Sequence, residues 1–412
     1  MKKSSTQSSD SSISEPEPIG LGSEIFFAQN RNPLAPAPKI ALVASIAWTL
    51  WNYRLALIHA LEQAGYEVVL IAGDDASRLK LERHTRTKFF PLKHINRSSL
   101  SPFANLRLLF ELYRSLRRVK PDVVCLFTIR PNTLGNFAAA ALGTPAISTI
   151  EGMGISGSNK WWLRKLMLLL YRLAFRSAKK VIFLNKDDYQ EFVEKQVVHP
   201  SKSLLIPGPG INLEHFSPRK KQQESKGIVF LFVARLLSEK GIREFAQAAR
   251  MIKSEGHHAE FRVLGSTDAG NPTSIEAAEL TEWIHEDILH YYGFVDDVRP
   301  AIAEADVLVL PSYYREGVPR SVLEGMAMGK MIITTESVGC RDTVEDEGNG
   351  YLVPPRDAGA LAEAIKKTLA LSDAQIQAMG QKSREKVERE FSDGMVLPRY
   401  LELVRGILDG KP

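Results

Sequence analysis

The chain has 412 residues, of which 44% are hydrophobic, and this length predicts two or three compact domains. Its two cysteines, Cys125 and Cys340, stand far apart, which excludes a disulfide framework and a cysteine-based metal site and indicates a reducing compartment. No run of 18 apolar residues occurs, so a membrane-spanning helix is not expected.

The amino-terminal segment, residues 1–38, is rich in serine and lacks the apolar stretch of a secretory signal. Its composition predicts a disordered tail. Residues 1–210 carry 28 Lys and Arg against 16 Asp and Glu, a net charge of +12, and the remainder carries −7. A basic front half suggests an anionic surface or substrate as its partner, although chance can also produce such a division.

The first ordered element is predicted at residues 39–46, a continuous apolar run typical of a buried strand. Helical patterns follow at residues 51–65 and 105–122. Further strands are predicted at residues 66–73, 123–129, 145–154, 179–185 and 202–210. Strands that alternate with helices predict a parallel, doubly wound sheet over residues 39–210.

After a junction rich in proline, glycine and charge, the alternation restarts at residue 227. A second α/β domain is therefore predicted over residues 211–393, and residues 394–412 are expected to form a helix that packs back on the first domain. Two doubly wound domains in tandem form a cleft between them. Because ligands of open α/β sheets bind at the carboxyl ends of strands, chemistry is expected in the loops after the strands.

The first such loop in the second domain contains Arg235 and Lys240, five positions apart, between a strand and a helix. Two cations beside the free N–H groups of a helix start suit a diphosphate. Taken alone, this pair is also typical of an ordinary surface, because basic residues are common near helix starts.

The loop YREGVPRSVLEGMAMGK, residues 314–330, carries two glutamates eight positions apart. Glu316 precedes a turn in which Gly317 lets the backbone approach a ligand closely. Glu324 lies about one turn into the following helix. Carboxylates accept hydrogen bonds from vicinal hydroxyls, so Glu324 suits a ribose and Glu316 a transferred sugar, with a diphosphate between them. An exposed loop charge and a solvated helix position explain the same spacing equally well. The residues expected at the donor are Gly317, Val318, Arg320 and Ser321, with Glu316 and Glu324.

These motifs resemble those of the family 4 retaining glycosyltransferases, which have the GT-B fold. The likeness is carried by residues 205–218, 234–245 and 293–355. Glu316 and Glu324 match the E-x7-E motif of that family, and Arg235 and Lys240 match its diphosphate-binding pair. The resemblance implies catalytic roles for Arg235, Lys240 and Glu316, and a GT-B fold of two doubly wound, Rossmann-like domains with an interdomain cleft.

Shorter stretches resemble the branch that assembles capsule, O-antigen and N-glycan precursors on lipid carriers, including bacillosaminyl-diphospho-undecaprenol N-acetylgalactosaminyltransferases. They are INRSSLSPF, TIRPNTLGN, IEGMGISG and STDAGNPTSI. Many family members have a histidine after the strand that reads VVCLFTIRPN here. This chain has Ile129 and Arg130 instead, so no histidine can orient a substrate there.

The acceptor implied by this branch is a polyprenyl-diphosphate-linked saccharide, and the donor is a nucleotide sugar, with UDP as the expected nucleotide. Four residues of the basic front half are candidates for contacts with the acceptor, although ordinary structural pairing explains arginines of this kind as well. They are Arg54, Arg97, Arg130 and Glu151. Residues 161–180 combine two tryptophans with Lys165, Arg172, Arg176 and Lys179, a pattern typical of a helix on an anionic membrane face but also of an ordinary packed helix.

No D-x-D sequence occurs, so neither a metal nor another cofactor is expected, and the cations near the diphosphate would neutralise the leaving group. A UDP-sugar 2-epimerase of the same fold and a non-catalytic nucleotide-sugar binder remain alternatives. The epimerase would need acid and base residues that are not evident. Basic residues without interleaved stacking aromatics argue against a nucleic-acid partner. The expected location is cytoplasmic, at the inner face of the plasma membrane.

Overall fold

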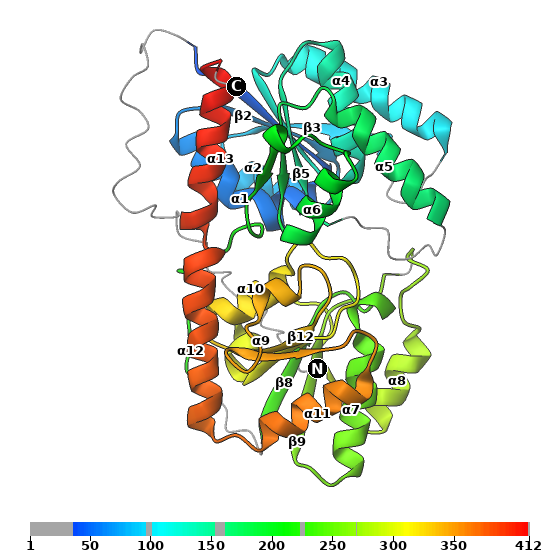
Figure 1. Ribbon diagram of the computed structural model, residues 1–412, viewed down its shortest axis with the longest axis vertical. Helices are drawn as coiled ribbons and strands as arrows, with labels where there is room; N and C mark the ends of the chain where they lie inside the picture. Colours follow the sequence, from blue (N-terminus) through cyan, green and yellow to red (C-terminus); the bar gives the residue numbers. More distant parts are fainter. Residues whose placement is uncertain (1–35, 96–100, 153–160, 223–226, 269, 411–412) are drawn as a thin grey trace, which may run out of the picture.

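The computed structural model describes residues 36–95, 101–152, 161–222, 227–268 and 270–410. Two parallel sheets, one above the other in Figure 1, form its framework. The first sheet has the strand order β3-β2-β1-β4-β5-β6-β7, and the second has the order β10-β9-β8-β11-β12-β13. The predicted pair of doubly wound α/β domains is confirmed.

The strands of the first sheet are β1 (Lys39–Ile46), β2 (Glu67–Gly73), β3 (Lys88–Leu92), β4 (Val123–Phe127), β5 (Ala146–Ile150), β6 (Lys180–Phe183) and β7 (Ser203–Leu205). The helices between them are α1 (Ala47–Gln63), α2 (Ser77–His84), α3 (Pro102–Val119), α4 (Asn136–Ala141), α5 (Trp161–Phe175) and α6 (Lys186–Glu194), with a π-helical turn at Pro131–Gly135 and a 3-10 turn at Pro200–Lys202. The strand order reverses between β1 and β4.

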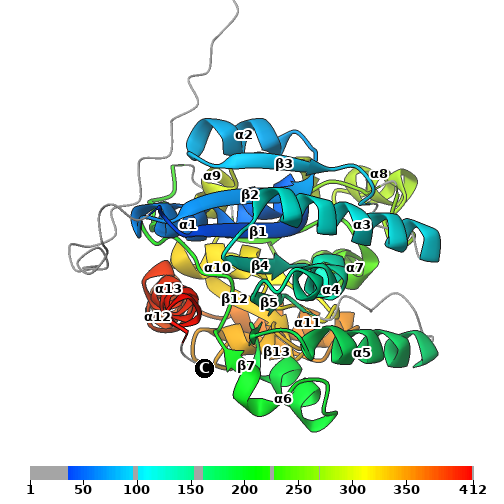
Figure 2. The same ribbon diagram turned by 90° about the horizontal axis from the view of Figure 1, so that it is seen from above.

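The first sheet is covered on both faces because its strands are apolar on both faces. Ile40 and Leu42 of β1 pack with α1, whereas Ala41 and Val43 pack with α3 and α4. Figure 2, seen from above, shows α1 on one side of β1 and β4 and α4 on the other. This explains the continuous apolar run from which β1 was predicted.

The second domain repeats this plan with the strands β8 (Ile228–Val233), β9 (Ala259–Leu264), β10 (His290–Tyr291), β11 (Val307–Leu310), β12 (Met331–Thr335) and β13 (Gly350–Val353). Its helices are α7 (Ile242–Ser254), α8 (Ala277–His285), α9 (Arg299–Glu304), α10 (Arg320–Ala327), α11 (Ala358–Leu369) and α12 (Asp373–Glu390), with 3-10 turns at Ser238–Lys240 and Arg341–Thr343. One core of buried residues runs through this domain.

The last helix, α13 (Asp393–Leu408), lies beside the first domain. Its buried residues Val396, Tyr400 and Val404 belong to the same core as Ile40 of β1. The preceding helix α12 belongs to the second domain, where Val387 joins that domain's core. The two helices follow one another along one side of the molecule (Figure 1), so the chain crosses the domain boundary between them.

Candidate functional site

The turn after β8 brings Lys240 to the end of the neighbouring strand β11. Gly241, which opens α7, has a φ of +81°, and a Cβ at this position would collide with the carbonyl oxygen of Pro311. Only glycine allows the backbone to approach so closely. The backbone on either side of Gly241 is therefore pressed against the segment between β11 and α10, residues 311–319, which we call the donor loop.

Backbone hydrogen bonds fix the donor loop to this turn. The carbonyl oxygen of Glu239 accepts hydrogen bonds from Tyr313 N at 3.0 Å, Tyr314 N at 3.2 Å and Ser312 Oγ at 3.1 Å. Since three donors converge on one carbonyl group, the first half of the donor loop is tied to the residue that precedes Lys240. The sequence predicted both loops, and the structure joins them.

Lys240 and Glu316 form an ion pair within this junction. Their side chains are 15% and 12% exposed. Ser312 Oγ also lies 3.1 Å from Glu316 Oε1, so its single hydroxyl proton is shared between this carboxylate and the Glu239 carbonyl oxygen. A ligand hydroxyl at Glu316 or a ligand anion at Lys240 would replace one member of this pair.

The start of α10 holds a second ion pair, in which Arg320 Nε lies 3.0 Å from Glu324 Oε1. Burial raises the pKa of the Glu324 carboxyl, and Arg320 opposes this shift. Pro319, which precedes α10, provides no side-chain cap for the helix. The backbone N–H groups of the first turn, near Ser321, can therefore donate hydrogen bonds to an anion.

Arg235 lies at the outer edge of the site. Its side chain is 51% exposed, and its Nη1 atom lies 3.1 Å from Asp268 Oδ2. Burial raises the pKa of Tyr314 to about 12, and Arg235 acts against this shift. The Nζ atom of Lys240 lies 5.2 Å from the centre of the Tyr314 ring. Tyr314 thus lies near both basic residues that were expected at a diphosphate.

The first domain contributes Glu151, which directly follows β5 and whose backbone contacts the donor loop at Gly317. Glu151 forms an ion pair with Arg54 of α1 and is 21% exposed. Arg54 is 1% exposed and lies 4.5 Å from the centre of the Phe127 ring. Arg54 therefore has almost no surface for an acceptor diphosphate here, and its visible role is structural pairing that orients Glu151.

The other two acceptor candidates are less defined. Arg130 is partly buried, and burial lowers its pKa. Arg97 lies outside the described residues. Among the described residues, no group of three or more His, Cys, Asp or Glu could hold a metal ion.

Comparison with known protein families finds a match for each of the two domains. Residues 49–209 match the model described as glycosyl transferase 4-like domain, and residues 227–370 match the model described as glycosyl transferases group 1. The two models follow one another along the chain and together cover most of it. Both halves of the chain are therefore glycosyltransferase domains.

Two relatives and one solved structure illustrate the likeness of this glycosyltransferase. It is 29% identical to N,N'-diacetylbacillosaminyl-diphospho-undecaprenol alpha-1,3-N-acetylgalactosaminyltransferase of Campylobacter jejuni, over 89% of this chain and 98% of the relative. It is 24% identical to UDP-Gal:alpha-D-GlcNAc-diphosphoundecaprenol alpha-1,3-galactosyltransferase of Escherichia coli, over 71% of this chain and 78% of the relative. The structure of Anabaena HepE in complex with UDP superimposes with a TM-score of 0.71 at 18% identity, over 90% of this chain and 100% of HepE. The fold is GT-B, as the motifs implied.

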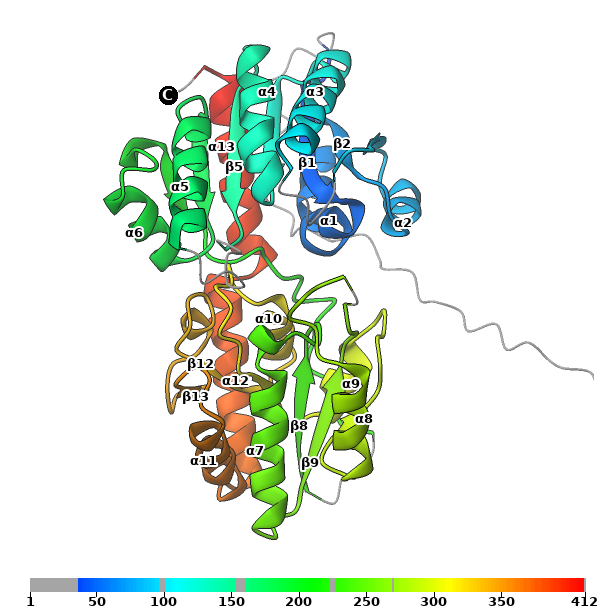
Figure 3. The ribbon, with the colours of Figure 1, turned by 90° about the vertical axis from the view of Figure 1, so that its right-hand side faces the viewer.

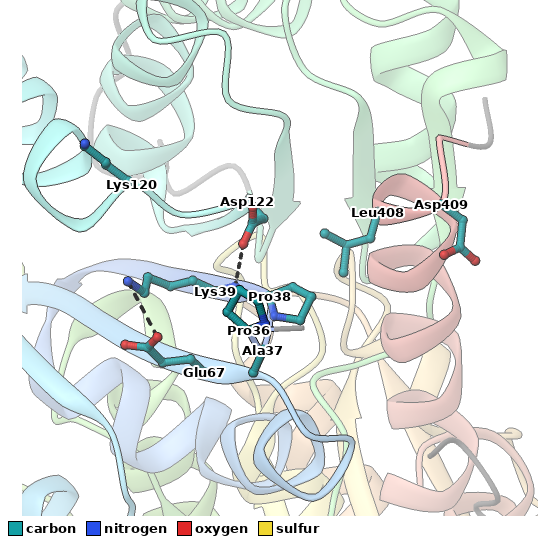
Figure 4. A pocket seen from close by; sticks show the side chains of 9 residues that line it. All are labelled: Pro36, Ala37, Pro38, Lys39, Glu67, Lys120, Asp122, Leu408 and Asp409. Carbon is teal, nitrogen blue, oxygen red and sulfur yellow. Dashed lines mark hydrogen bonds and ion pairs between the residues drawn. The ribbon is translucent and has the colours of Figure 1, made fainter. Parts of the chain in front are cut away.

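A cavity of about 540 Å³ lies elsewhere in the glycosyltransferase, at the amino end of β1 (Figure 4). It is lined by residues 36–39, Glu67, Lys120, Asp122 and the end of α13. Lys39 N donates a hydrogen bond to Asp122 Oδ2 at 2.7 Å, and Lys39 Nζ lies 3.5 Å from Glu67 Oε2. Because ligands of such sheets bind at the opposite, carboxyl ends of the strands, this cavity is separate from the candidate site.

Sequence reasoning missed several residues that border the site. Tyr53 of α1 lies with its ring centre 5.8 Å from the Arg320 guanidinium carbon, and burial raises its pKa to about 12. Thr128, after β4, has a φ of +67°, a strained conformation for a β-branched residue, and shares a hydrogen bond of 2.7 Å with Ser45 near the end of β1. This contact lies where the strand order reverses, a signal that the strand pattern alone could have supplied.

Proposed function

We propose that this protein is a retaining glycosyltransferase that moves a hexose or N-acetylhexosamine from a nucleotide sugar to a polyprenyl-diphosphate-linked saccharide. The observation that carries the proposal is the pairing of Lys240 with Glu316 and of Arg320 with Glu324 on one loop and one helix start. The two relatives named above act on diphospho-undecaprenol-linked sugars, and one name specifies UDP-Gal as its donor. UDP is the nucleotide that we propose.

In this proposal, the donor diphosphate takes Lys240 and Arg235 as its partners, and Glu316 turns to the hydroxyls of the transferred sugar. The acceptor hydroxyl oxygen bonds to the anomeric carbon as the bond from that carbon to the phosphate oxygen breaks. The hydroxyl proton passes to the departing phosphate oxygen on the same face, so the configuration is retained. Lys240, Arg235 and the start of α10 balance the charge that develops on the diphosphate, and no metal is required.

We further propose that the first domain lies on an anionic membrane. The described residues include no helix long and apolar enough to cross a bilayer. However, α5 exposes Trp162, Leu166 and Leu169 by 50%, 44% and 52%. Lys165, Arg172 and Arg176 are also exposed. An apolar stripe with basic neighbours suits the interface of an anionic bilayer better than a position inside a core.

A second helix supports the same surface. On α3, Phe103, Leu106 and Phe110 are 79%, 52% and 58% exposed. Their spacing of three and four residues places them on one face, and the exposed Arg107 and Arg114 lie on the same helix. The short helix α4 packs against both α3 and α5, and Figure 3 shows the three side by side. We therefore propose that α3 and α5 contact the membrane together.

One experiment tests the proposed reaction. The full chain is incubated with a panel of UDP- and GDP-sugars and lipid-linked saccharide acceptors, with and without EDTA, and products are identified by mass spectrometry. We expect transfer from a UDP-sugar that EDTA does not reduce. Epimerised donor without transfer would establish the epimerase alternative, and binding without turnover would establish a nucleotide-sugar binder. Activity lost in EDTA and restored by magnesium would refute metal independence.

A further inference from the structure

Asn185 links the first domain to the donor loop of the second. It follows β6, is 2% exposed, and caps α6 by accepting a hydrogen bond from Asp188 N at 2.7 Å. Its Nδ2 atom donates to the carbonyl oxygens of Glu316 and Gly317, each at 3.1 Å. We infer that Asn185 is a positioning residue that makes the placement of Glu316 depend on closure of the two domains.

A buried ion pair lies beside this link. Asp188 is fully buried, and its Oδ1 atom lies 2.6 Å from Arg315 Nη2 of the donor loop. Arg315 Nη1 also lies 2.8 Å from Glu191 Oε2 of α6. Burial raises the pKa of Asp188, while its hydrogen bond with Asn185 and its pairing with Arg315 oppose that shift. Because a buried carboxylate without its partner is costly in free energy, moving Arg315 and the donor loop away from Asp188 is unfavourable.

Backbone contacts leave the donor loop little room on this side. A Cβ at Gly152, whose φ is +102°, would lie 2.6 Å from the carbonyl oxygen of Arg315. A Cβ at Gly317 would lie 2.9 Å from the carbonyl oxygen of Glu151. The end of β5 and the donor loop thus meet with no side chain between them, and Asn185 donates its hydrogen bonds beside this contact.

These contacts hold Glu316 from both domains. Its carboxylate pairs with Lys240 of the second domain, and its carbonyl oxygen accepts a hydrogen bond from Asn185 of the first. If the domains separate, the Asn185 bonds are lost and the donor loop is held only from the second domain. Resting on the proposed function, this inference assigns Asn185 the task of ordering the sugar-binding part of the site when the cleft is closed.

Two substitutions at Asn185 separate this role from helix capping. Serine and aspartate are good helix caps, but serine is too short to donate to two carbonyl groups and aspartate would face them with a negative charge. A capping role alone predicts that Asn185→Ser behaves like wild type, whereas Asn185→Asp also brings a second carboxylate beside Asp188 Oδ2, which now accepts a hydrogen bond from Asn185 Nδ2 at 3.0 Å. The positioning role predicts that kcat falls by about tenfold in Asn185→Ser and further in Asn185→Asp, while UDP affinity stays within about twofold.

Asp357→Ser is the matched control. Asp357 caps α11 by accepting a hydrogen bond from Ala360 N at 2.8 Å, and this helix belongs to the second domain. We expect this exchange of one cap for another to leave kcat unchanged. Asn185→Ser with wild-type kcat, or with UDP binding lost in proportion to kcat, would overturn the inference.

Hydrogen–deuterium exchange decides the same question without any substrate. Backbone amides of residues 312–318 should exchange several times faster in Asn185→Ser than in wild type, and those of α7 should not change. Unchanged exchange in the donor loop would overturn the inference. If the wild type transfers no sugar but the donor loop responds in this way, the proposed reaction fails and the link through Asn185 stands.

Discussion

Glu316 and Glu324 occupy different electrostatic settings although both are nearly buried. Glu316 pairs with Lys240 and sits on a loop, whereas Glu324 pairs with Arg320 inside a helix. In the proposed reaction, Glu324 holds the ribose, which does not change between ground and transition states. Glu316 holds the sugar that gains positive charge as its bond to the phosphate lengthens. Only the second interaction strengthens in the transition state.

Glu316→Gln should therefore lower kcat by about a hundredfold with little change in donor affinity, because glutamine keeps the size of the side chain but not its charge. Glu324→Gln should chiefly raise the donor KM, since uniform binding is lost. Steady-state kinetics on both variants with one donor measures this difference. Normal turnover of Glu316→Gln together with a loss of kcat in Glu324→Gln would show that the two roles are reversed.

The basic pair leads to a second prediction. Lys240→Ala and Arg235→Ala should each slow transfer by about a hundredfold or more, the usual loss for one group that stabilises transition-state charge. Lys253→Ala, at the far end of α7, is the control and should transfer at the wild-type rate. Folded Arg235→Ala with normal activity would place the diphosphate away from Arg235, whose present partner is Asp268.

At the scale of residues, the sequence predicts the donor side better than the acceptor side. The motif residues Lys240, Glu316 and Glu324 are close in sequence to strand ends, so their local elements bring them together. Arg54 is different, because its burial against Phe127 and Glu151 depends on α1 and β5, which are distant in sequence. Asn185 was predicted only as the last residue of a strand, residues 179–185, and its two bonds to the donor loop depend on how the domains meet.

Among the elements, α5 connects the basic front half to the proposed membrane surface. A Lys165/Arg172/Arg176→Glu triple variant should bind anionic liposomes at least about tenfold more weakly than wild type, because each basic residue near such a surface contributes roughly 1 kcal/mol. Binding of the wild type should weaken with salt as charges are screened. Co-sedimentation at two salt concentrations measures both effects.

A Lys220/Lys367/Lys382→Glu variant is the control, since it changes the net charge equally with exposed residues of the second domain. It should bind liposomes nearly as well as wild type. Equal binding by the α5 variant and the wild type would remove α5 from the membrane surface. Equal weakening by both triple variants would show that binding follows net charge alone.

Strands and helices with a clear apolar pattern were predicted well, and those without one were not. β1 was predicted with its observed bounds, Lys39–Ile46. α1 begins at Ala47, four residues before its predicted start. β3 was missed because it is a short edge strand with Pro91, a residue that weakens strand signals. α12 was missed because most of its residues are polar and exposed, so its helical period carries little apolar contrast.

For the whole molecule, the order of elements indicated two domains and a cleft, but the way in which the domains meet could not be derived from the sequence. Asp393 lies at this meeting point, where its N–H donates to the carbonyl oxygen of Ile211 at 3.0 Å. A Cβ at Gly210 would lie 2.5 Å from Asp393 Oδ1. The two crossings between the domains therefore touch each other at an acidic residue.

Burial raises the pKa of the Asp393 carboxyl to about 6, and Arg320 opposes this shift. An unfolded aspartate has a pKa of about 3.9, so the charged form is disfavoured in the folded protein. The folded protein has its full stability at pH values below the unfolded pKa, where the carboxyl is protonated in both states. This stability is lost as the pH rises through the folded pKa. At pH 8 the loss is on the order of 3 kcal/mol by linkage.

Asp393→Asn removes this charge at every pH, so the variant should melt several degrees above wild type at pH 8. Because linkage leaves about half of the loss at pH 5, the gain in melting temperature should shrink by about half there. Thermal denaturation at the two pH values measures it. Asp373→Asn is the control for the substitution itself, since Asp373 holds the same first position in α12 and is exposed. A gain for Asp393→Asn that is equal at both pH values, or absent at pH 8, would show that the carboxylate at the domain crossing does not strain the folded state.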